Sequence, residues 1–247
     1  MPVLIAAATP ELDLVRPLAM RLLGDGGEVR CYLDEEDHDL RSAGCKLAVG
    51  MLGDEVNLEA ALTNVHTFIP VLPDPLRLDD ADALASLRSF GIAAAEAAGS
   101  AGIEQTILAL PRLPAAANPL TEAFDEIASA FAAAVRPLCI LRTALVWSED
   151  RPLASIVRRL RGHGPSLPVV SSGEVALALA AVDDREETHG EWELGGRSYL
   201  VGELAGLAGA GPAREPSLWV AGILAAPMPV MGHSGSEEFG VPPQPLR

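Results

Sequence analysis

The segment 1–34 has the pattern of a β-strand, an α-helix and a second β-strand. Residues 3–8 are a short apolar run, which predicts a strand. The apolar positions of 12–23 recur with a helical period, and 28–33 predicts another strand. This order predicts a βαβ unit, which needs a parallel sheet covered by helices.

The first turn of this unit lacks the glycines that a dinucleotide site normally uses. Glycines there let the backbone approach a diphosphate, but Ala7, Pro10 and Asp13 occupy their places. Proline has no N–H, and a Cβ atom crowds the turn. Asp13 adds a negative charge near a helix N-terminus, where a phosphate would otherwise be favoured. We therefore expect no bound cofactor.

Strand and helix patterns alternate over the first two-thirds of the chain, which predicts a doubly wound parallel α/β sheet. The further predicted strands are 46–49, 67–71, 105–110 and 138–146, and the predicted helices are 57–62, 79–101, 120–134 and 152–160. We expect a loop at 162–168, a helix from Ser171 to Val182 and polar turns at 183–191.

The net charge of −16 makes nucleic acid an unfavourable partner, because like charges repel. No apolar run reaches the ~20 residues that span a bilayer, so we expect no membrane segment. The first strand begins almost at residue 1, and we place the protein in the cytoplasm. Cys31, Cys45 and Cys139 are too scattered for a disulfide framework or a metal site, and we interpret them as core residues.

Several segments together resemble one protein superfamily. They are VLIAAATPELDLVRPLAMRLLGDGGEVRCYLD, GCKLAVGMLGDEVNLEAALTNVHTFIPV, AAEAAGSAGIEQTILAL, CILRTALVW with its triplet Ile140-Leu141-Arg142, EVALALAAV and GRSYLVGELAGLAG. In this order the chain resembles the extended and atypical short-chain dehydrogenase/reductases, in particular NmrA-like members, over about residues 2–210. The resemblance implies a Rossmann-like core at 1–150, a small C-terminal substrate-side subdomain at 151–226 and a Pro/Gly-rich tail at 227–247.

The resemblance also implies where a dinucleotide would lie if one binds. The matching positions are Ala7, Thr9, Pro10, Glu11, Leu12, Asp34, Met51, Leu52 and Leu72. An acidic residue after the second strand, here Asp34, hydrogen-bonds the adenosine ribose and disfavours a 2′-phosphate. Any retained cofactor should therefore be NAD(H) rather than NADP(H). The alternative is that the acidic run 34–39 is only a solvated loop.

The catalytic residues of the superfamily are absent. Relatives use a tyrosine and a lysine four residues apart before the sixth strand, with a serine or threonine after the fifth. This chain has only Tyr32, Tyr199 and Lys46, none at that spacing, and the serine position falls at Leu110 or Pro111. We assign no catalytic residue.

Three functions follow from this pattern. We favour a degenerate, non-catalytic reductase-like protein that acts as a sensor, a regulator or a subunit. The second is an atypical NAD(H)-dependent oxidoreductase or isomerase, and the third is a binder of another small molecule in the cleft. The alanine-rich helices 79–101 and 120–134 suggest a homodimer or a complex with a related subunit.

Overall fold

The computed structural model describes residues 1–78, 80–114, 119–148, 151–160, 166–185, 188–208, 224, 231–232, 234–241 and 246. Its main sheet has seven strands in the order β3-β2-β1-β4-β5-β6-β9, and every neighbouring pair is parallel. The strands are β1 (Pro2–Ala7), β2 (Glu28–Leu33), β3 (Lys46–Val49), β4 (Thr67–Val71), β5 (Gln105–Pro111), β6 (Leu138–Thr143) and β9 (Gly190–Leu194). This arrangement confirms the predicted doubly wound, Rossmann-like sheet.

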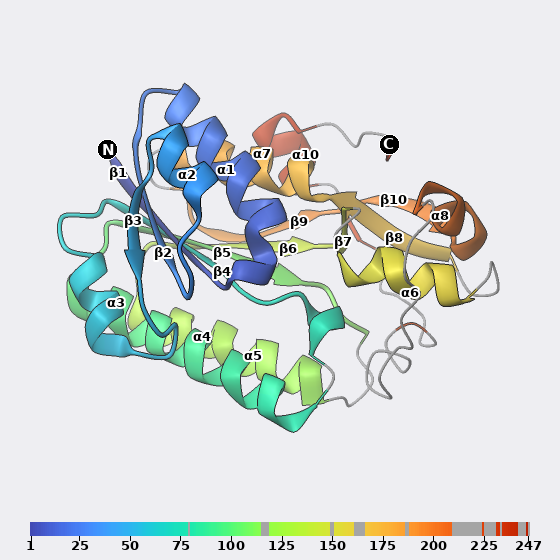
Figure 1. Ribbon diagram of the computed structural model, residues 1–247, viewed down its shortest axis with the longest axis horizontal. Helices are drawn as coiled ribbons and strands as arrows, with labels where there is room; N and C mark the ends of the chain where they lie inside the picture. Colours follow the sequence, from blue (N-terminus) through green and yellow to red (C-terminus); the bar gives the residue numbers. More distant parts are fainter. Residues whose placement is uncertain are drawn as a thin grey trace.

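Helices cover both faces of the main sheet (Figure 1). One face carries α1 (Leu12–Gly24), α2 (His38–Ala43), α7 (Ser172–Asp183) and α10 (Ser234–Phe239), and the other carries α3 (Glu55–Ala61), α4 (Ala81–Ala101) and α5 (Pro119–Ala134). Asp80 accepts a hydrogen bond from the Ala83 amide and so caps α4, which begins two residues after the predicted start at 79. Among the described residues, no helix combines the length and apolar character needed to cross a bilayer.

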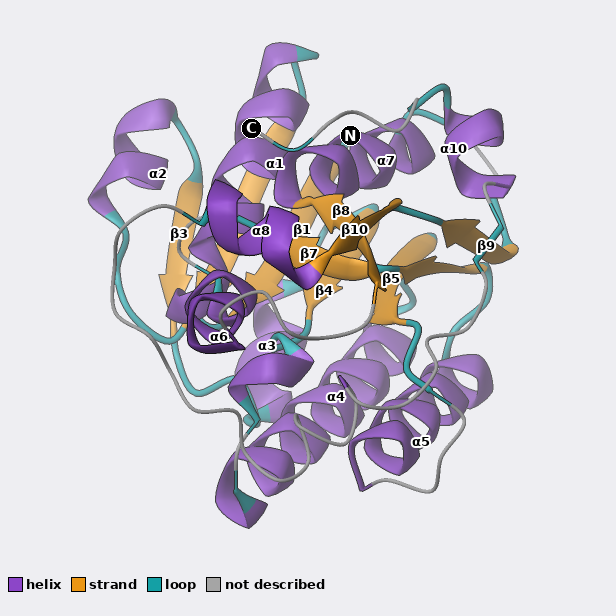
Figure 2. Cartoon of the chain, turned by 90° about the vertical axis from the view of Figure 1, so that its right-hand side faces the viewer, coloured by secondary structure: helices purple, strands orange, loops and turns teal. Residues whose placement is uncertain are grey.

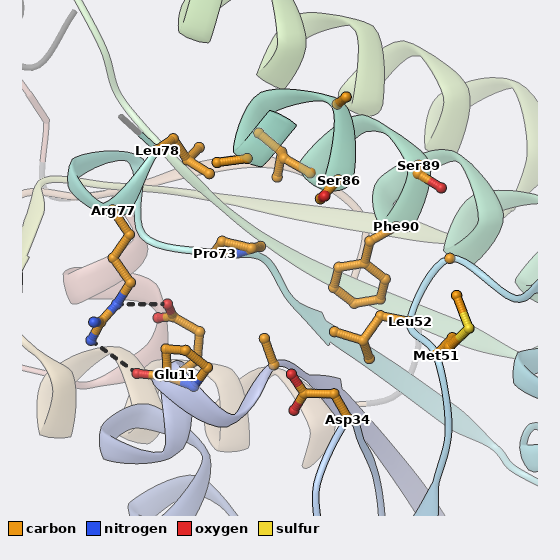
Figure 3. Close-up of a pocket in the computed structure, with 16 residues that line it drawn as sticks. Glu11, Asp34, Met51, Leu52, Pro73, Arg77, Leu78, Ser86, Ser89 and Phe90 are labelled. Carbon is orange, nitrogen blue, oxygen red and sulfur yellow. Dashed lines mark hydrogen bonds and ion pairs between the residues drawn. The ribbon is translucent and has the colours of Figure 1, made fainter. Parts of the chain in front are cut away.

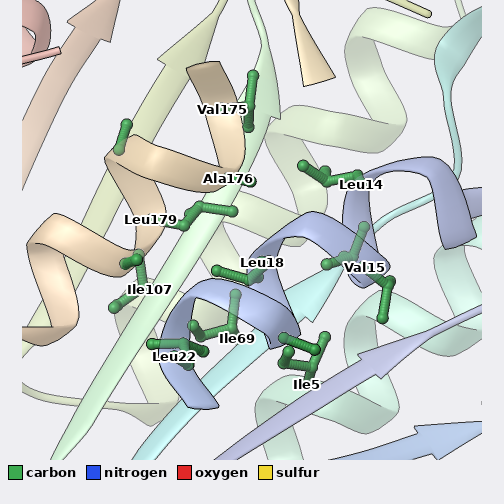
Figure 4. Close-up of a cluster of buried hydrophobic side chains, with 14 of the residues drawn as sticks. Ile5, Leu14, Val15, Leu18, Leu22, Ile69, Ile107, Val175, Ala176 and Leu179 are labelled. Carbon is green, nitrogen blue, oxygen red and sulfur yellow. The ribbon is translucent and has the colours of Figure 1, made fainter. Parts of the chain in front are cut away.

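The core on the α1 side is aliphatic. Leu14, Leu18 and Leu22 of α1 meet Ile5 of β1 and Leu179 of α7 (Figure 4). Their helical spacing places them on one face of α1, as the sequence predicts. The same cluster contains all three cysteines, which are free and buried.

The core on the other face depends on close contact between α4 and α5. Gly91 of α4 faces Ile127 of α5, which is fully buried. A Cβ atom at position 91 would lie 2.5 Å from the Ile127 Cγ1 atom and 2.6 Å from its Cδ1 atom. The missing side chain therefore allows the two helices to approach.

A second sheet lies beyond the carboxyl ends of the main strands, on the side that faces the viewer in Figure 2. It has the order β10-β8-β7, from β7 (Leu145–Trp147), β8 (Ser166–Ser171) and β10 (Arg197–Leu200). It shares an apolar cluster with α6 (Pro152–Leu160) and α8 (Val201–Leu207). The chain after residue 151 contributes to both sheets, because β8 and β10 belong to the second sheet and β9 belongs to the main sheet.

Several predicted boundaries need correction. The predicted strand 138–146 divides at Ala144, where the chain passes from β6 in one sheet to β7 in the other. No glycine or proline lies between the two strands to indicate the division. Residues 166–168, predicted as loop because of Gly and Pro, begin β8. Within the predicted turns at 183–191, residue 190 starts β9, an edge strand whose first two residues are exposed and continue the polar composition of the turns. Residues 37–39 of the acidic run 34–39 also form the N-terminus of α2: Asp37 is the N-cap, and His38 and Asp39 belong to the first turn.

We predict that Gly91→Ala lowers the free energy of unfolding by about 1–2 kcal/mol, because overpacking outweighs the gain of about 1 kcal/mol in helix propensity. Gly206→Ala in α8 is the control, since nothing lies within 4 Å of a Cβ atom there. Urea unfolding should show the control unchanged or slightly stabilised. Equal effects of the two substitutions would contradict the close α4–α5 contact.

Candidate functional site

The candidate site lies between β1 and β4. After β1 the chain continues to β2 on one side of the sheet, and after β4 it continues to β5 on the other. Open α/β sheets bind ligands at such a switch point, beyond the carboxyl ends of the strands. Two short 3-10 helices border it: η1 (Thr9–Glu11) follows β1, and η2 (Pro75–Arg77) follows β4.

A cavity of about 680 Å³ opens beside this point, which is within the usual size of small-molecule sites. Its wall is mostly apolar and comes from the ends of β1 to β4 and from α4 (Figure 3). The lining residues include Ala8, Pro10, Glu11, Asp34, Met51, Leu52, Gly53, Pro73, Arg77, Leu78, Ser86, Ser89 and Phe90.

Asp34 stands at the rim of the cavity and is fixed by the first turn. Its Oδ1 atom accepts hydrogen bonds from the Thr9 amide at 2.7 Å and the Thr9 hydroxyl at 2.6 Å. Asp37, three residues on, caps α2 and pairs with Arg16 at 2.6 Å. The acidic run is thus not uniform, since Asp34 alone of it lines the cavity.

Tyr32 supports the opposite wall. Its hydroxyl donates to the Met51 carbonyl at 3.0 Å from within the core of the α4 side. Gly50 allows this contact, because a Cβ atom there would lie 2.3 Å from the tyrosine oxygen. Tyr32 therefore holds the segment after β3 in place.

The amides of the first turn are already hydrogen-bonded within the protein. The Thr9 amide donates to Asp34, the Glu11 amide to the Ala8 carbonyl at 2.9 Å, and the Leu12 amide to the Thr9 carbonyl. Pro10 has no amide hydrogen. The turn therefore lacks the amide donors by which glycine-rich turns hold a diphosphate.

Buried charges surround the turn instead. The guanidinium of Arg151, only 3% exposed, contacts Glu11 Oε2 at 2.9 Å, Asp13 Oδ2 at 2.7 Å and Asp74 Oδ2 at 3.0 Å. Glu11 Oε1 also accepts from the Asp74 amide at 3.1 Å. Arg151 precedes α6, so one side chain joins the turn after β1, the loop after β4 and the small subdomain.

The sequence interpretation of Asp13 needs correction. We expected an uncompensated negative charge that would repel a phosphate. Its carboxylate is instead paired with Arg151 and accepts a hydrogen bond from the Ser148 hydroxyl at 2.7 Å. Residue 151 is far away in the sequence, and no local pattern shows this pairing.

Burial raises the pKa of Glu11 to about 7, while the positive charge of Arg151 opposes that rise. Arg77 of η2 approaches the same carboxylate: its Nε atom lies 3.2 Å from Glu11 Oε1, and its Nη2 atom donates to the Pro10 carbonyl at 3.0 Å. Figure 3 shows this guanidinium beside the first turn. Two cations thus share one buried carboxylate.

The structure brings together five of the nine residues assigned by resemblance, Pro10, Glu11, Asp34, Met51 and Leu52, as lining of the cavity. Ala7 and Leu72 are buried in the two cores, Leu12 packs against the α1-side core, and Thr9 acts through Asp34. The sequence interpretation missed Arg77, Pro73, Phe90 and, in α4, Ser86 and Ser89. Only tertiary contact reveals them, although the helical spacing of Ser86, Ser89 and Phe90 is compatible with one shared face.

The tyrosines and the lysine have structural roles away from α5. Tyr32 is in β2, and the Tyr199 hydroxyl accepts from the Leu246 amide at 3.0 Å. Lys46 pairs with Glu28 at 2.9 Å. No tyrosine or lysine occurs in α5, and Leu110 and Pro111 end β5.

No protein-family model matches the chain, and no curated protein matches it. Solved structures match over nearly the whole chain. MoeE5 in complex with UDP-glucose and NAD has a TM-score of 0.77 at 15% identity, covering 99% of this chain and 94% of that one. The Thermus thermophilus UDP-glucose 4-epimerase complex with NAD has a TM-score of 0.72 at 16% identity, with the same coverage.

A Staphylococcus aureus nucleoside-diphosphate-sugar epimerase has a TM-score of 0.72 at 14% identity and covers 100% of this chain and 98% of that one. The chain has the fold of these structures, and this agrees with the fold that the sequence resemblance implies. The expectation that no cofactor binds is contradicted, because structures of this fold, MoeE5 and the Thermus epimerase among them, hold NAD despite their distant sequences.

We predict that the free energy of unfolding falls as pH rises from about 4.5 to about 7, with Glu11 as a main contributor. The folded protein retains the Glu11 proton at higher pH than the unfolded chain does, so folding binds protons within this window. Glu11→Gln should flatten the slope, whereas the exposed Glu59→Gln control should keep it. Urea unfolding over this pH range measures both slopes, and an unchanged slope in Glu11→Gln would exclude Glu11 as its source.

Proposed function

We propose that this chain binds NAD(H) in the cavity beside η1 and acts as a non-catalytic sensor, regulator or subunit. The observation that carries the proposal is the position of Asp34 at the rim of an apolar cavity. An acidic side chain after the second strand is the group that accepts hydrogen bonds from an adenosine ribose in this kind of site. The likeness to NAD-bound structures supports the same ligand.

The residues present fit the adenosine half of the dinucleotide. Met51, Leu52 and Phe90 offer apolar surface for the adenine ring. Asp34 uses Oδ1 for Thr9, which leaves Oδ2 as the acceptor for a ribose hydroxyl. The same carboxylate disfavours the 2′-phosphate of NADP(H) by charge repulsion.

We infer the non-catalytic role from the absence of the residue pair that transfers the proton in related enzymes. A bound nicotinamide supplies hydride chemistry, but oxidation of an alcohol also needs a group that removes the hydroxyl proton. The usual tyrosine–lysine pair is absent from α5, and both tyrosines hold other parts of the fold. The protein would accordingly report on NAD(H) rather than turn it over.

An NAD-dependent epimerase or oxidoreductase is the second candidate. It is supported by the names of the similar structures, which include epimerases of nucleotide sugars. Incubation with UDP-glucose and NAD⁺ distinguishes the two candidates. Formation of a new sugar nucleotide or of reduced nicotinamide would favour the enzyme. The cytoplasmic location and the homodimer or related-subunit complex remain proposals, and light scattering tests the assembly.

We predict that the protein binds NAD⁺ at least about tenfold more tightly than NADP⁺, and that Asp34→Ala weakens NAD⁺ binding by about ten- to a hundredfold. A hydrogen bond to a charged acceptor contributes roughly 1.5–3 kcal/mol, which corresponds to this range. Asp39→Ala is the control, because Asp39 belongs to the same acidic run but is 78% exposed and pairs with Arg16. Isothermal titration calorimetry measures all four affinities. Equal loss in both variants, or no NAD⁺ binding by the wild type, would contradict the proposal.

A further inference from the structure

Arg77 lies where a dinucleotide would cross from one strand end to the other. It ends η2, lines the cavity and places its guanidinium on the first turn, within 3.0 Å of the Pro10 carbonyl. Its side chain is 26% exposed, whereas that of Arg151 is only 3% exposed and contacts three carboxylates. Arg77 is therefore the more accessible of the two cations at the turn.

The charge around the turn makes a cation necessary for an anionic ligand. Glu11, Asp13, Asp34 and Asp74 all lie at this end of the sheet, in a chain with net charge −16. In the turn, the amides of Thr9, Glu11 and Leu12 donate within the protein, and Pro10 has no amide hydrogen. A diphosphate needs compensation from a side chain at this point.

We propose that Arg77 binds the diphosphate of the dinucleotide in place of the missing amide donors, and so makes the site select phosphorylated adenosine ligands over the nucleoside. The inference rests on NAD(H) as the ligand of this cavity. Arginine suits the role because its planar guanidinium forms paired hydrogen bonds with phosphate oxygens.

Movement of the Arg77 side chain from Glu11 to a phosphate leaves Glu11 with other partners. When Arg77 turns toward a phosphate, the Glu11 carboxylate keeps Arg151 at 2.9 Å and the Asp74 amide at 3.1 Å. No buried charge is left without a partner, so the exchange avoids the large cost of an orphaned ion. The buried pair holds the turn, and Arg77 serves the ligand.

The test compares NAD⁺, ADP and adenosine in isothermal titration calorimetry. Arg77→Gln should weaken NAD⁺ and ADP by about ten- to a hundredfold and leave adenosine within about twofold, because only the phosphates lose a charged partner. Arg77→Lys, which keeps the charge, should recover part of the ADP affinity. Arg88→Gln is the matched control, since Arg88 pairs with Glu126 at 2.9 Å on the surface of α4 and α5.

The outcomes separate this inference from the proposed function. Equal loss for all three ligands, or no loss for any, in variants whose thermal unfolding matches the wild type overturns the role of Arg77. Wild-type protein that binds ADP through Arg77 but not NAD⁺ overturns the proposed function and supports the role of Arg77. A wild type that binds none of the three ligands overturns both.

Discussion

The buried contact of Arg151 with Glu11, Asp13 and Asp74 joins the parts of the molecule on which the site depends. It holds the turn after β1 against the loop after β4, and it connects both to the segment that begins α6. Isolated, each of these charges would be unfavourable in the interior, and the Arg151 guanidinium offsets part of the negative charge of the three carboxylates. The ligand crevice is consequently bordered by a fixed ionic framework rather than by a flexible glycine turn.

This framework explains how a Rossmann-type scaffold persists without its usual turn. A glycine turn binds a diphosphate by its amides, but here those amides stabilise the turn itself and its contact with Asp34. The apolar wall and Asp34 keep the features that suit adenosine. We propose that side chains take over recognition of the phosphates from the backbone, and that Arg77 is the best placed of them.

The regular elements follow from local patterns, whereas the site does not. The helical spacing in α1 and the apolar runs of β2 and β4 predict these elements with nearly the observed bounds. The edge strand β9 escapes prediction although residues 191–194 alternate between polar and apolar, because the strand is short and its exposed first residues continue the polar turn-like segment before it. The interpretation of Asp13 is wrong because the charge of Asp13 is paired with Arg151. Arg151 is distant in the sequence, and only the fold brings the two residues together. Asp34, which lines the cavity, can be located from sequence because it directly follows the second strand.

The most direct test is to replace Arg151 by methionine and to measure both the free energy of unfolding and the affinity for NAD⁺. The account predicts a loss of about 3–5 kcal/mol in stability, because Asp74 and Asp13 lose their cation and the buried Glu11 loses one of its two, together with weaker NAD⁺ binding by the protein that remains folded. Arg88→Met, at an exposed ion pair, should cost less than about 1 kcal/mol. An Arg151→Met protein with wild-type stability and affinity would contradict the account.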